Sequence, residues 1–246
     1  MSEKRLPMIL VFAGPNGSGK STITSMVDSI GVYINADEIK KTTGCDDLTA
    51  AIDAETRRNA CIDRKEDFTF ETVLSTRRNL DLLRKAKENG YFIKAFFVLT
   101  DDPMVNIMRV ATRVARGGHD VPKNKIIKRY HGSLAILPEL IQVCDICNVY
   151  DNTAKKPYRI FSKKKDTYRL WESAFFKKDR ILTLTGCEAM ASHIVDCTVS
   201  HKNLIEEHYL SEEKRKQVQE NARKTTKQPQ VPTLDQKHGT GGETLE

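Results

Sequence analysis

The sequence lacks any apolar run long enough to cross a membrane, and its first residues lack the apolar core and cleavage site of a secretory signal. Its six cysteines are scattered, and only Cys144 and Cys147 have the spacing of a metal or redox pair. No second CxxC or histidine pair completes a zinc site, so we interpret the cysteines as structural thiols. These absences favour a protein of the reduced cytoplasm without a membrane partner.

A strong charge imbalance is also missing. The chain has 40 Lys and Arg against 33 Asp and Glu, a net charge of +7. This mild excess suits a polyanionic ligand such as a nucleotide but is too weak to indicate nucleic acid. The basic stretch from Lys214 to Lys227 contains no aromatic side chains on which bases would stack. Nucleic acid is therefore not the expected partner.

The first positive signal is a P-loop. The apolar run Met8–Ala13 precedes Gly14-Pro15-Asn16-Gly17-Ser18-Gly19-Lys20-Ser21, which matches the pattern GxxxxGK[ST]. This predicts a buried strand, a loop whose N–H groups surround phosphates, and a helix over Ser21–Ser29. Lys20 would contact the β- and γ-phosphates of ATP or GTP, and Ser21 would hold Mg²⁺. The predicted nucleotide-binding residues are 14–21, Thr22 and the more distant Asn152.

Strand-like runs alternate with helical patterns along the chain, which predicts an α/β fold with a parallel sheet. The expected strands are Met8–Ala13, Val32–Asn35, Phe68–Glu71, Phe92–Leu99 and Ile146–Tyr150. Helices are expected over 46–66, over 79–89 and after Asp101-Asp102. Later segments are predicted as a hairpin of Tyr158–Phe161 with Thr167–Trp171, a short strand at Ile181–Leu184 and a helical region over Cys187–Tyr209.

These elements predict a three-layer P-loop NTPase of the nucleotide-kinase type with a helical lid. The kinase domain is expected over 1–185, with the lid at about 103–132. A small helical extension is expected over 186–224, and the polar composition of 225–246 predicts a disordered tail.

Two carboxylates follow expected strands, where a parallel sheet presents its ligand cleft. Asp37 comes after Val32–Asn35, and its carboxylate either accepts a proton from an attacking hydroxyl or caps the helix Glu38–Lys41. Glu71 either binds substrate hydroxyls, holds Mg²⁺ through water or lies in solvent. Ser75 either contacts substrate or caps the next helix.

Basic residues gather in the predicted lid. Arg109, Arg113 and Arg116 share a helical face that stops at Gly117-Gly118, and a second basic helix carries Arg129. Beside a P-loop, this pattern favours a lid that brings guanidinium groups over phosphates and excludes water. The alternative is a solvated pair of basic helices.

Two further residues remain ambiguous. Asn152 either lines the nucleotide base or turns the chain after its strand. His119 is more typical of a hydrogen-bonding loop residue than of a catalyst.

Together these motifs resemble the zeta-toxin family of P-loop kinases, in its compact chromosomal branch. The resemblance covers about Leu6 to Thr153. Its motifs are the P-loop, Asn35-Ala-Asp37-Glu-Ile, Phe70-Glu71-Thr72-x-x-Ser75, Arg113-Val-x-x-Gly-Gly-His119-x-Val-Pro122, Arg129-Tyr130 and Val149-Tyr-Asp-Asn152.

The resemblance implies phosphoryl transfer to a sugar hydroxyl of a nucleotide sugar such as UDP-N-acetylglucosamine. It implies Asp37 as the base, with Lys20, Arg113, Arg116 and Arg129 completing the catalytic set. The implied substrate-binding residues are Asn35, Asp37, Glu71, Thr72, Ser75 and His119. An antitoxin, if one exists, would be a separate chain. Two alternatives remain open: a kinase for another phosphorylated metabolite or a nucleic-acid end, and a non-catalytic ATP-binding regulatory module.

Overall fold

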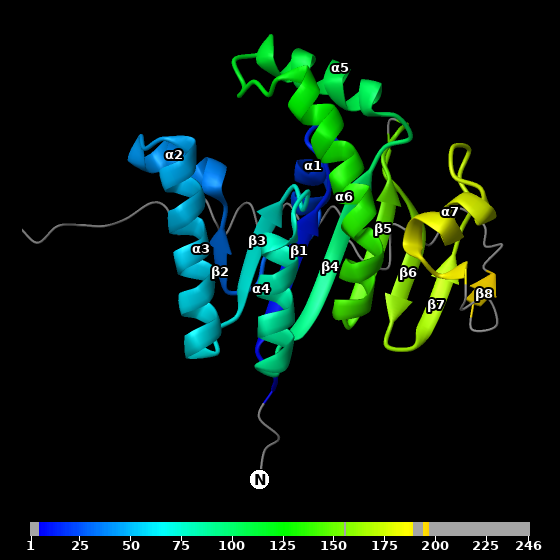
Figure 1. The fold of residues 1–246 in the computed structure, drawn as a ribbon, viewed down its shortest axis with the longest axis horizontal. Helices are drawn as coiled ribbons and strands as arrows, with labels where there is room; N and C mark the ends of the chain where they lie inside the picture. The colour runs from blue at the N-terminus through cyan, green and yellow to red at the C-terminus, as the bar shows by residue number, and fades with distance from the viewer. Residues whose placement is uncertain (1–4, 155, 189–193, 197–246) are drawn as a thin grey trace, which may run out of the picture. The chain divides into compact units, whose positions relative to one another are not determined.

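The fold is an eight-stranded sheet with helices on both faces (Figure 1). A computed structural model describes residues 5–154, 156–188 and 194–196, all within one compact unit spanning 1–209. The strands are β1 (Met8–Ala13), β2 (Val32–Ile34), β3 (Phe68–Thr72), β4 (Phe92–Leu99), β5 (Ile146–Asp151), β6 (Tyr158–Lys164), β7 (Thr167–Leu170) and β8 (Ile194–Asp196). The helices are α1 (Lys20–Thr24), α2 (Ala36–Thr43), α3 (Asp47–Arg64), α4 (Arg77–Glu88), α5 (Pro103–Val114), α6 (Lys123–Val143) and α7 (Lys178–Thr185).

The strand order is β2-β3-β1-β4-β5-β6-β7-β8. Strands β1 to β5 run parallel, so their carboxyl ends meet at one edge. Strand β6 pairs antiparallel with β5 and with β7, which confirms the predicted hairpin. The α/β fold with a largely parallel sheet is therefore confirmed.

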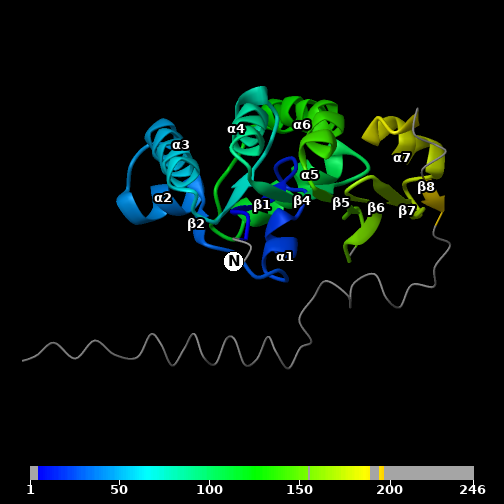
Figure 2. The ribbon, with the colours of Figure 1, turned by 90° about the horizontal axis from the view of Figure 1, so that it is seen from below.

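The central strands are apolar on both sides because both faces of the sheet are covered. Along β1, Ile9 and Val11 belong to the larger core cluster, whereas Leu10 and Phe12 belong to a smaller cluster on the other face. Helices α3, α4 and α6 lie on one face and α1 on the opposite face (Figure 2). This arrangement is the predicted three-layer architecture.

Helix α1 is shorter than predicted. It ends at Thr24 instead of Ser29, with Ser25 as its C-cap, and the Ser25 hydroxyl donates to the carbonyl of Thr22 at 2.9 Å. Such local side-chain bonds compete with helix propagation. The chain then turns into β2 at Gly31, where φ is 54° and a Cβ would lie 1.8 Å from the Asp67 carbonyl oxygen.

Two predictions near the end of the described region are wrong. Residues 181–184 form part of helix α7 instead of a strand, because Ile181 and Thr185 are buried one turn apart and Gly186 ends the helix at φ 68°. The segment 187–209 is not wholly helical, since 194–196 form β8 beside β7. The remainder of the predicted extension and tail, apart from 186–188, lies outside the described residues.

The predicted lid comprises α5, the following loop and the start of α6. Asp102 caps α5 as expected, its side chain accepting from the Met104 amide. The predicted lid boundary near 132 falls inside α6, a single 21-residue helix that continues to Val143 and buries Leu137 and Leu140 in the core. The second lid helix is therefore the first part of a core helix. Within the described ranges, no helix combines the length and the apolar character needed to cross a membrane.

We expect Phe97→Ala to lower the free energy of unfolding by about 3–5 kcal/mol, because this ring is fully buried in β4 and its loss leaves a cavity. Phe175→Ala is the matched control, since Phe175 is 40% exposed. Urea unfolding followed by circular dichroism measures both. Equal destabilisation of the two variants would contradict the assigned core.

Candidate active site

The P-loop lies so close to its neighbours that its glycines have no room for a side chain. Gly14, Gly17 and Gly19 have φ of 138°, 76° and 91°. A Cβ on Gly14 would lie 2.0 Å from the Val98 carbonyl oxygen, and one on Gly17 would lie 2.5 Å from that of Asn106. Glycine is therefore required both by the backbone conformation and by the contacts.

Two buried asparagines hold the loop in place. The Asn106 amide in α5 donates to the carbonyl of Asn16 at 2.6 Å, and the Asn152 amide after β5 donates to that of Ser18 at 2.7 Å. Sequence reasoning assigned Asn152 to the nucleotide base or to a turn; the structure shows that it contacts the P-loop backbone. Sequence reasoning missed Asn106. The only sign of its role in the sequence is that a polar residue stands on the apolar face of an amphipathic helix.

The Lys20 ammonium lies inside the loop. Its Nζ donates to the carbonyls of Gly14 at 2.8 Å and Pro15 at 3.2 Å. Burial lowers the pKa of Lys20 to about 8; Glu71 and Asp37 act to raise it, and Arg113 and Arg129 to lower it. The charges of four predicted site residues, from four different segments, therefore act on one ammonium group.

Glu71 is held by hydrogen bonds at the end of β3. Its Oε1 accepts from the Thr24 hydroxyl at 3.0 Å and the Tyr33 hydroxyl at 2.8 Å. The Tyr33 oxygen accepts from the Asn35 amide at 3.2 Å. Glu71 therefore does not simply lie in solvent. Sequence reasoning missed Thr24 and Tyr33, because neither belongs to a motif.

Asn35, not Asp37, caps helix α2. The Asn35 Oδ1 accepts from the backbone N–H of Asp37 at 2.9 Å, so the capping alternative for Asp37 is wrong. The Asp37 side chain is exposed in the first turn of α2, and its charge acts to raise the pKa of Lys20. The carboxylate is thereby left available for chemistry.

The predicted lid arginines have different surroundings. Arg113 donates to the His119 carbonyl at 2.6 Å, and Arg129 donates to the Asn16 side chain at 3.2 Å. Arg109 instead donates to the carbonyls of Thr153 and Ala154. The side chains of Arg113 and Arg116 are both exposed, and the role of Arg116 stays a prediction. Of these arginines, Arg129 contacts the P-loop directly, and the charges of Arg113 and Arg129 act to lower the pKa of Lys20.

The other predicted substrate residues have local roles in the structure. The buried Thr72 hydroxyl accepts from the Leu74 amide in the turn after β3 and from the Asn79 side-chain amide at the start of α4. Ser75 does not cap α4, whose N-cap is Thr76. The side chain of His119 is exposed at the lid loop. Substrate contacts by these residues stay predictions.

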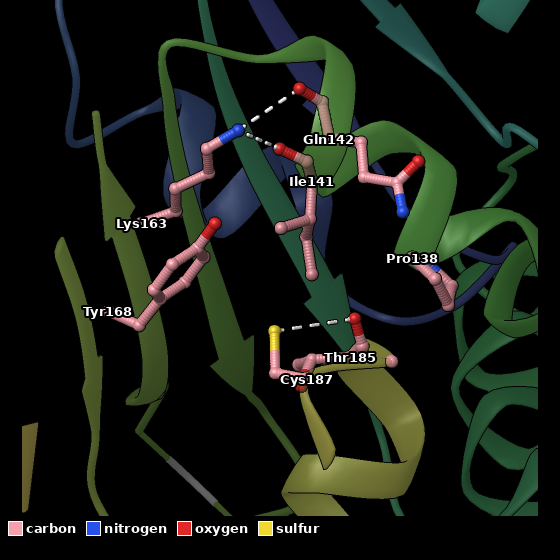
Figure 3. A pocket seen from close by; sticks show the side chains of 8 residues that line it. Pro138, Ile141, Gln142, Lys163, Tyr168, Thr185 and Cys187 are labelled. Carbon is pink, nitrogen blue, oxygen red and sulfur yellow. Dashed lines mark hydrogen bonds between the residues drawn. The ribbon is translucent and has the colours of Figure 1, made fainter. Parts of the chain in front are cut away.

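A hollow of about 200 Å³ lies away from the P-loop, between α6, the β6–β7 hairpin and α7 (Figure 3). Its Lys163 Nζ donates to the carbonyls of Ile141 at 2.7 Å and Gln142 at 3.0 Å. This ammonium satisfies orphan carbonyls in the last turn of α6. Lys163 therefore has a structural role.

A profile of the Zeta toxin family matches residues 1–173. The chain belongs to this family. Its described residues contain no group of three or more His, Cys, Asp or Glu that could hold a metal ion. The Zeta toxin assignment, together with the P-loop site, makes the protein a phosphotransferase of the P-loop kinase class.

Known proteins are similar to this chain in sequence or in fold. An adenylate kinase of Orientia tsutsugamushi is 27% identical, covering 78% of this chain and 95% of the relative. An uncharacterized protein of Haemophilus influenzae is 28% identical, covering 49% of this chain and 91% of the relative. The crystal structure of AvrRxo1-ORF1:-ORF2 with ATP aligns with TM-score 0.53 and 12% identity, covering 91% of this chain and 77% of that one. At this identity the structural likeness shows the fold alone.

ATP affinity should depend on the protonation of Lys20. Because its pKa in the nucleotide-free protein is about 8, we expect affinity to be constant near pH 7 and to fall above pH 8, by up to about tenfold per pH unit. Affinity falls as pH rises because phosphate favours the charged ammonium, so the pKa of Lys20 is higher in the complex than in the nucleotide-free protein. Calorimetric titration across this range measures the effect.

The matched control is Lys20→Met, which should bind ATP weakly and with no pH dependence between about pH 7 and 9. A wild-type affinity that stays constant up to pH 9.5 would contradict the lowered pKa of Lys20.

Proposed function

We propose that the protein transfers the γ-phosphoryl group of ATP to a sugar hydroxyl of a nucleotide sugar, with UDP-N-acetylglucosamine as the first acceptor to test. The observation that carries this proposal is that two carboxylates and two guanidinium groups lie near enough to Lys20 for their charges to act on its pKa. A nucleotide-binding module needs the ammonium and the loop alone. The additional groups suit a second substrate and the charge that develops during phosphoryl transfer.

The P-loop fits a triphosphate. Besides Lys20, it contains the Ser18 hydroxyl, which is buried and whose oxygen has no hydrogen-bond partner among the described residues. A phosphate oxygen would supply that partner. The five-residue helix α1 adds little macrodipole, so binding would depend on the loop N–H groups and on Lys20. ATP bound to AvrRxo1-ORF1:-ORF2, a neighbour in fold, supports the same choice of donor.

In the proposed reaction, Asp37 accepts the proton of the acceptor hydroxyl. The hydroxyl oxygen forms a bond to the γ-phosphorus while the bond from that phosphorus to the bridging oxygen breaks, and ADP leaves. Glu71 orients the acceptor through a hydrogen bond to its carboxylate. When bound, Mg²⁺ would be held by Ser21 and phosphate oxygens and would neutralise charge on the β- and γ-phosphates.

Arg113 and Arg129 would stabilise the transferring group. They lie on the two lid helices, α5 and α6; Arg129 contacts Asn16 of the P-loop, and the charges of both act on Lys20. Arg113 would leave the His119 carbonyl to reach a phosphate oxygen, a stronger, charge-assisted acceptor. Closing the lid also excludes water, which would otherwise compete with the sugar hydroxyl.

We place this reaction in the cytoplasm, and we propose that any antitoxin is a separate chain. The AvrRxo1-ORF1:-ORF2 complexes, similar in fold, contain a second chain and support that arrangement. An adenylate kinase among the relatives makes a nucleoside monophosphate the second acceptor to test.

Incubation with γ-labelled ATP and UDP-N-acetylglucosamine, AMP or an oligonucleotide tests the acceptor. We expect label on the nucleotide sugar alone. Label on AMP or on the oligonucleotide would replace the proposed acceptor, and label on none of the three would overturn the proposed function.

Asp37→Asn should bind ATP with wild-type affinity and lose at least about 10²-fold in transfer, because the amide cannot accept the proton. Glu71→Gln should mainly raise the acceptor KM. Glu38→Gln is the matched control, since this neighbouring carboxylate is also exposed in the first turn of α2. Unchanged transfer by Asp37→Asn would remove Asp37 as the base.

Ala variants of the lid arginines should differ in kcat in the same assay. We expect Arg113→Ala and Arg129→Ala to lower kcat by about 10²-fold or more, since each removes charge near the transferring group. Arg116→Ala, the matched control on the same lid, should change kcat less than about threefold. A large loss with Arg116→Ala alone would reverse this assignment.

A further inference from the structure

A directional chain of hydrogen bonds joins the two acidic residues of the proposed site. The Asp37 amide donates to Asn35 Oδ1 at 2.9 Å, which turns the Asn35 Nδ2 toward the Tyr33 oxygen at 3.2 Å. The phenol proton is then free to be donated to Glu71 Oε1 at 2.8 Å. The Tyr33 oxygen accepts from Asn35 and so directs its single proton to Glu71, which makes the orientation of the hydroxyl depend on that of Asn35.

The series of hydrogen bonds ends at Glu71 and leaves one oxygen of its carboxylate available. Its Oε1 already faces the hydroxyls of Tyr33 and Thr24, and no hydrogen bond to Oε2 is found among the described residues. A carboxylate has room for about four hydrogen bonds. A hydroxyl of the acceptor can therefore donate to Oε2 while Oε1 stays fixed.

Tyr33 contributes more than packing. It lies near the end of the three-residue strand β2, and its ring is only half-buried. Its pKa is raised above the usual value, first by burial, with the Asn35 hydrogen bond opposing the shift and Glu71 adding to it. The phenol therefore remains a donor at every physiological pH.

We propose that Tyr33 is a positioning residue that fixes the Glu71 carboxylate for the acceptor and ties it to the helix that carries Asp37. This inference rests on the proposed function, because it assigns Glu71 to acceptor binding. Tyr33 itself touches neither substrate, and it acts through Glu71 and Asn35.

Thr24 forms a second, weaker contact with the same oxygen. Its hydroxyl has one proton and two acceptors within reach, Glu71 Oε1 at 3.0 Å and the Lys20 carbonyl at 3.1 Å. The Thr24 proton can leave Glu71 without becoming unpaired, whereas the described residues offer the Tyr33 phenol no acceptor other than Glu71. Thr24→Val should therefore perturb acceptor binding less than Tyr33→Phe.

Steady-state kinetics with UDP-N-acetylglucosamine test the proposal. We expect Tyr33→Phe to raise the acceptor KM about tenfold or more, since it removes a hydrogen bond to a charged group. The ATP KM and the melting temperature should stay near wild-type values. Tyr168→Phe, a half-buried tyrosine of β7 beside the hollow of Figure 3, is the matched control and should leave both KM values unchanged.

A double-mutant cycle separates positioning from a general structural role. In the Glu71→Gln background, Tyr33→Phe should add less than about twofold to the acceptor KM, because its effect passes through the Glu71 carboxylate. Additive losses, or a parallel rise in the ATP KM, would overturn the proposal.

Amide hydrogen exchange distinguishes this proposal from the proposed function. In the nucleotide-free protein, Tyr33→Phe should speed exchange at the Asp37 amide about threefold or more, because Asn35 loses its anchor, while Tyr168→Phe should not. If no nucleotide sugar is phosphorylated, the proposed function fails, and faster exchange still supports the hydrogen-bonded network. Unchanged exchange at Asp37 would overturn the network whatever the acceptor.

Discussion

The tight packing of the P-loop against β4, α5 and the end of β5 is the constraint on which the site depends. Gly14 and Gly17 lie against backbone carbonyls, and the Asn106 and Asn152 amides hold the loop's own carbonyls. These carbonyls thereby have hydrogen-bond partners outside the loop. The same contacts join the loop to α5, so the position of the predicted lid is linked to the phosphate site.

The second organising feature is the balance of charge around Lys20. An ammonium placed in a partly buried loop is costly, and burial alone lowers its pKa. Asp37 and Glu71 compensate that cost, whereas Arg113 and Arg129 add to it. In the proposed reaction a triphosphate would reverse this balance, because its negative charge favours all three cations at once.

Sequence motifs alone predicted most of the polar residues of the candidate site. They succeeded where a few neighbouring residues determine the local conformation. The P-loop pattern, the capped start of α5 and the alternating strands were all predictable, because glycine, cap residues and apolar periodicity act over a few residues. Predictions failed where a short apolar run was ambiguous. Ile181–Leu184 is one such run, and its helix depends on packing of α7 against α6, which lie far apart in sequence.

Sequence by itself determined the family, the parallel sheet and the position of the P-loop, since motifs and apolar periodicity are encoded in short runs of residues. Only the tertiary structure decided which alternatives hold: Asn35 caps α2, leaving Asp37 free, and Arg129 contacts the P-loop through the Asn16 side chain. It also revealed Tyr33 and Asn106, which belong to no motif. Their roles arise from hydrogen bonds between segments 38 and 90 residues apart, and single-chain spacing cannot specify such geometry.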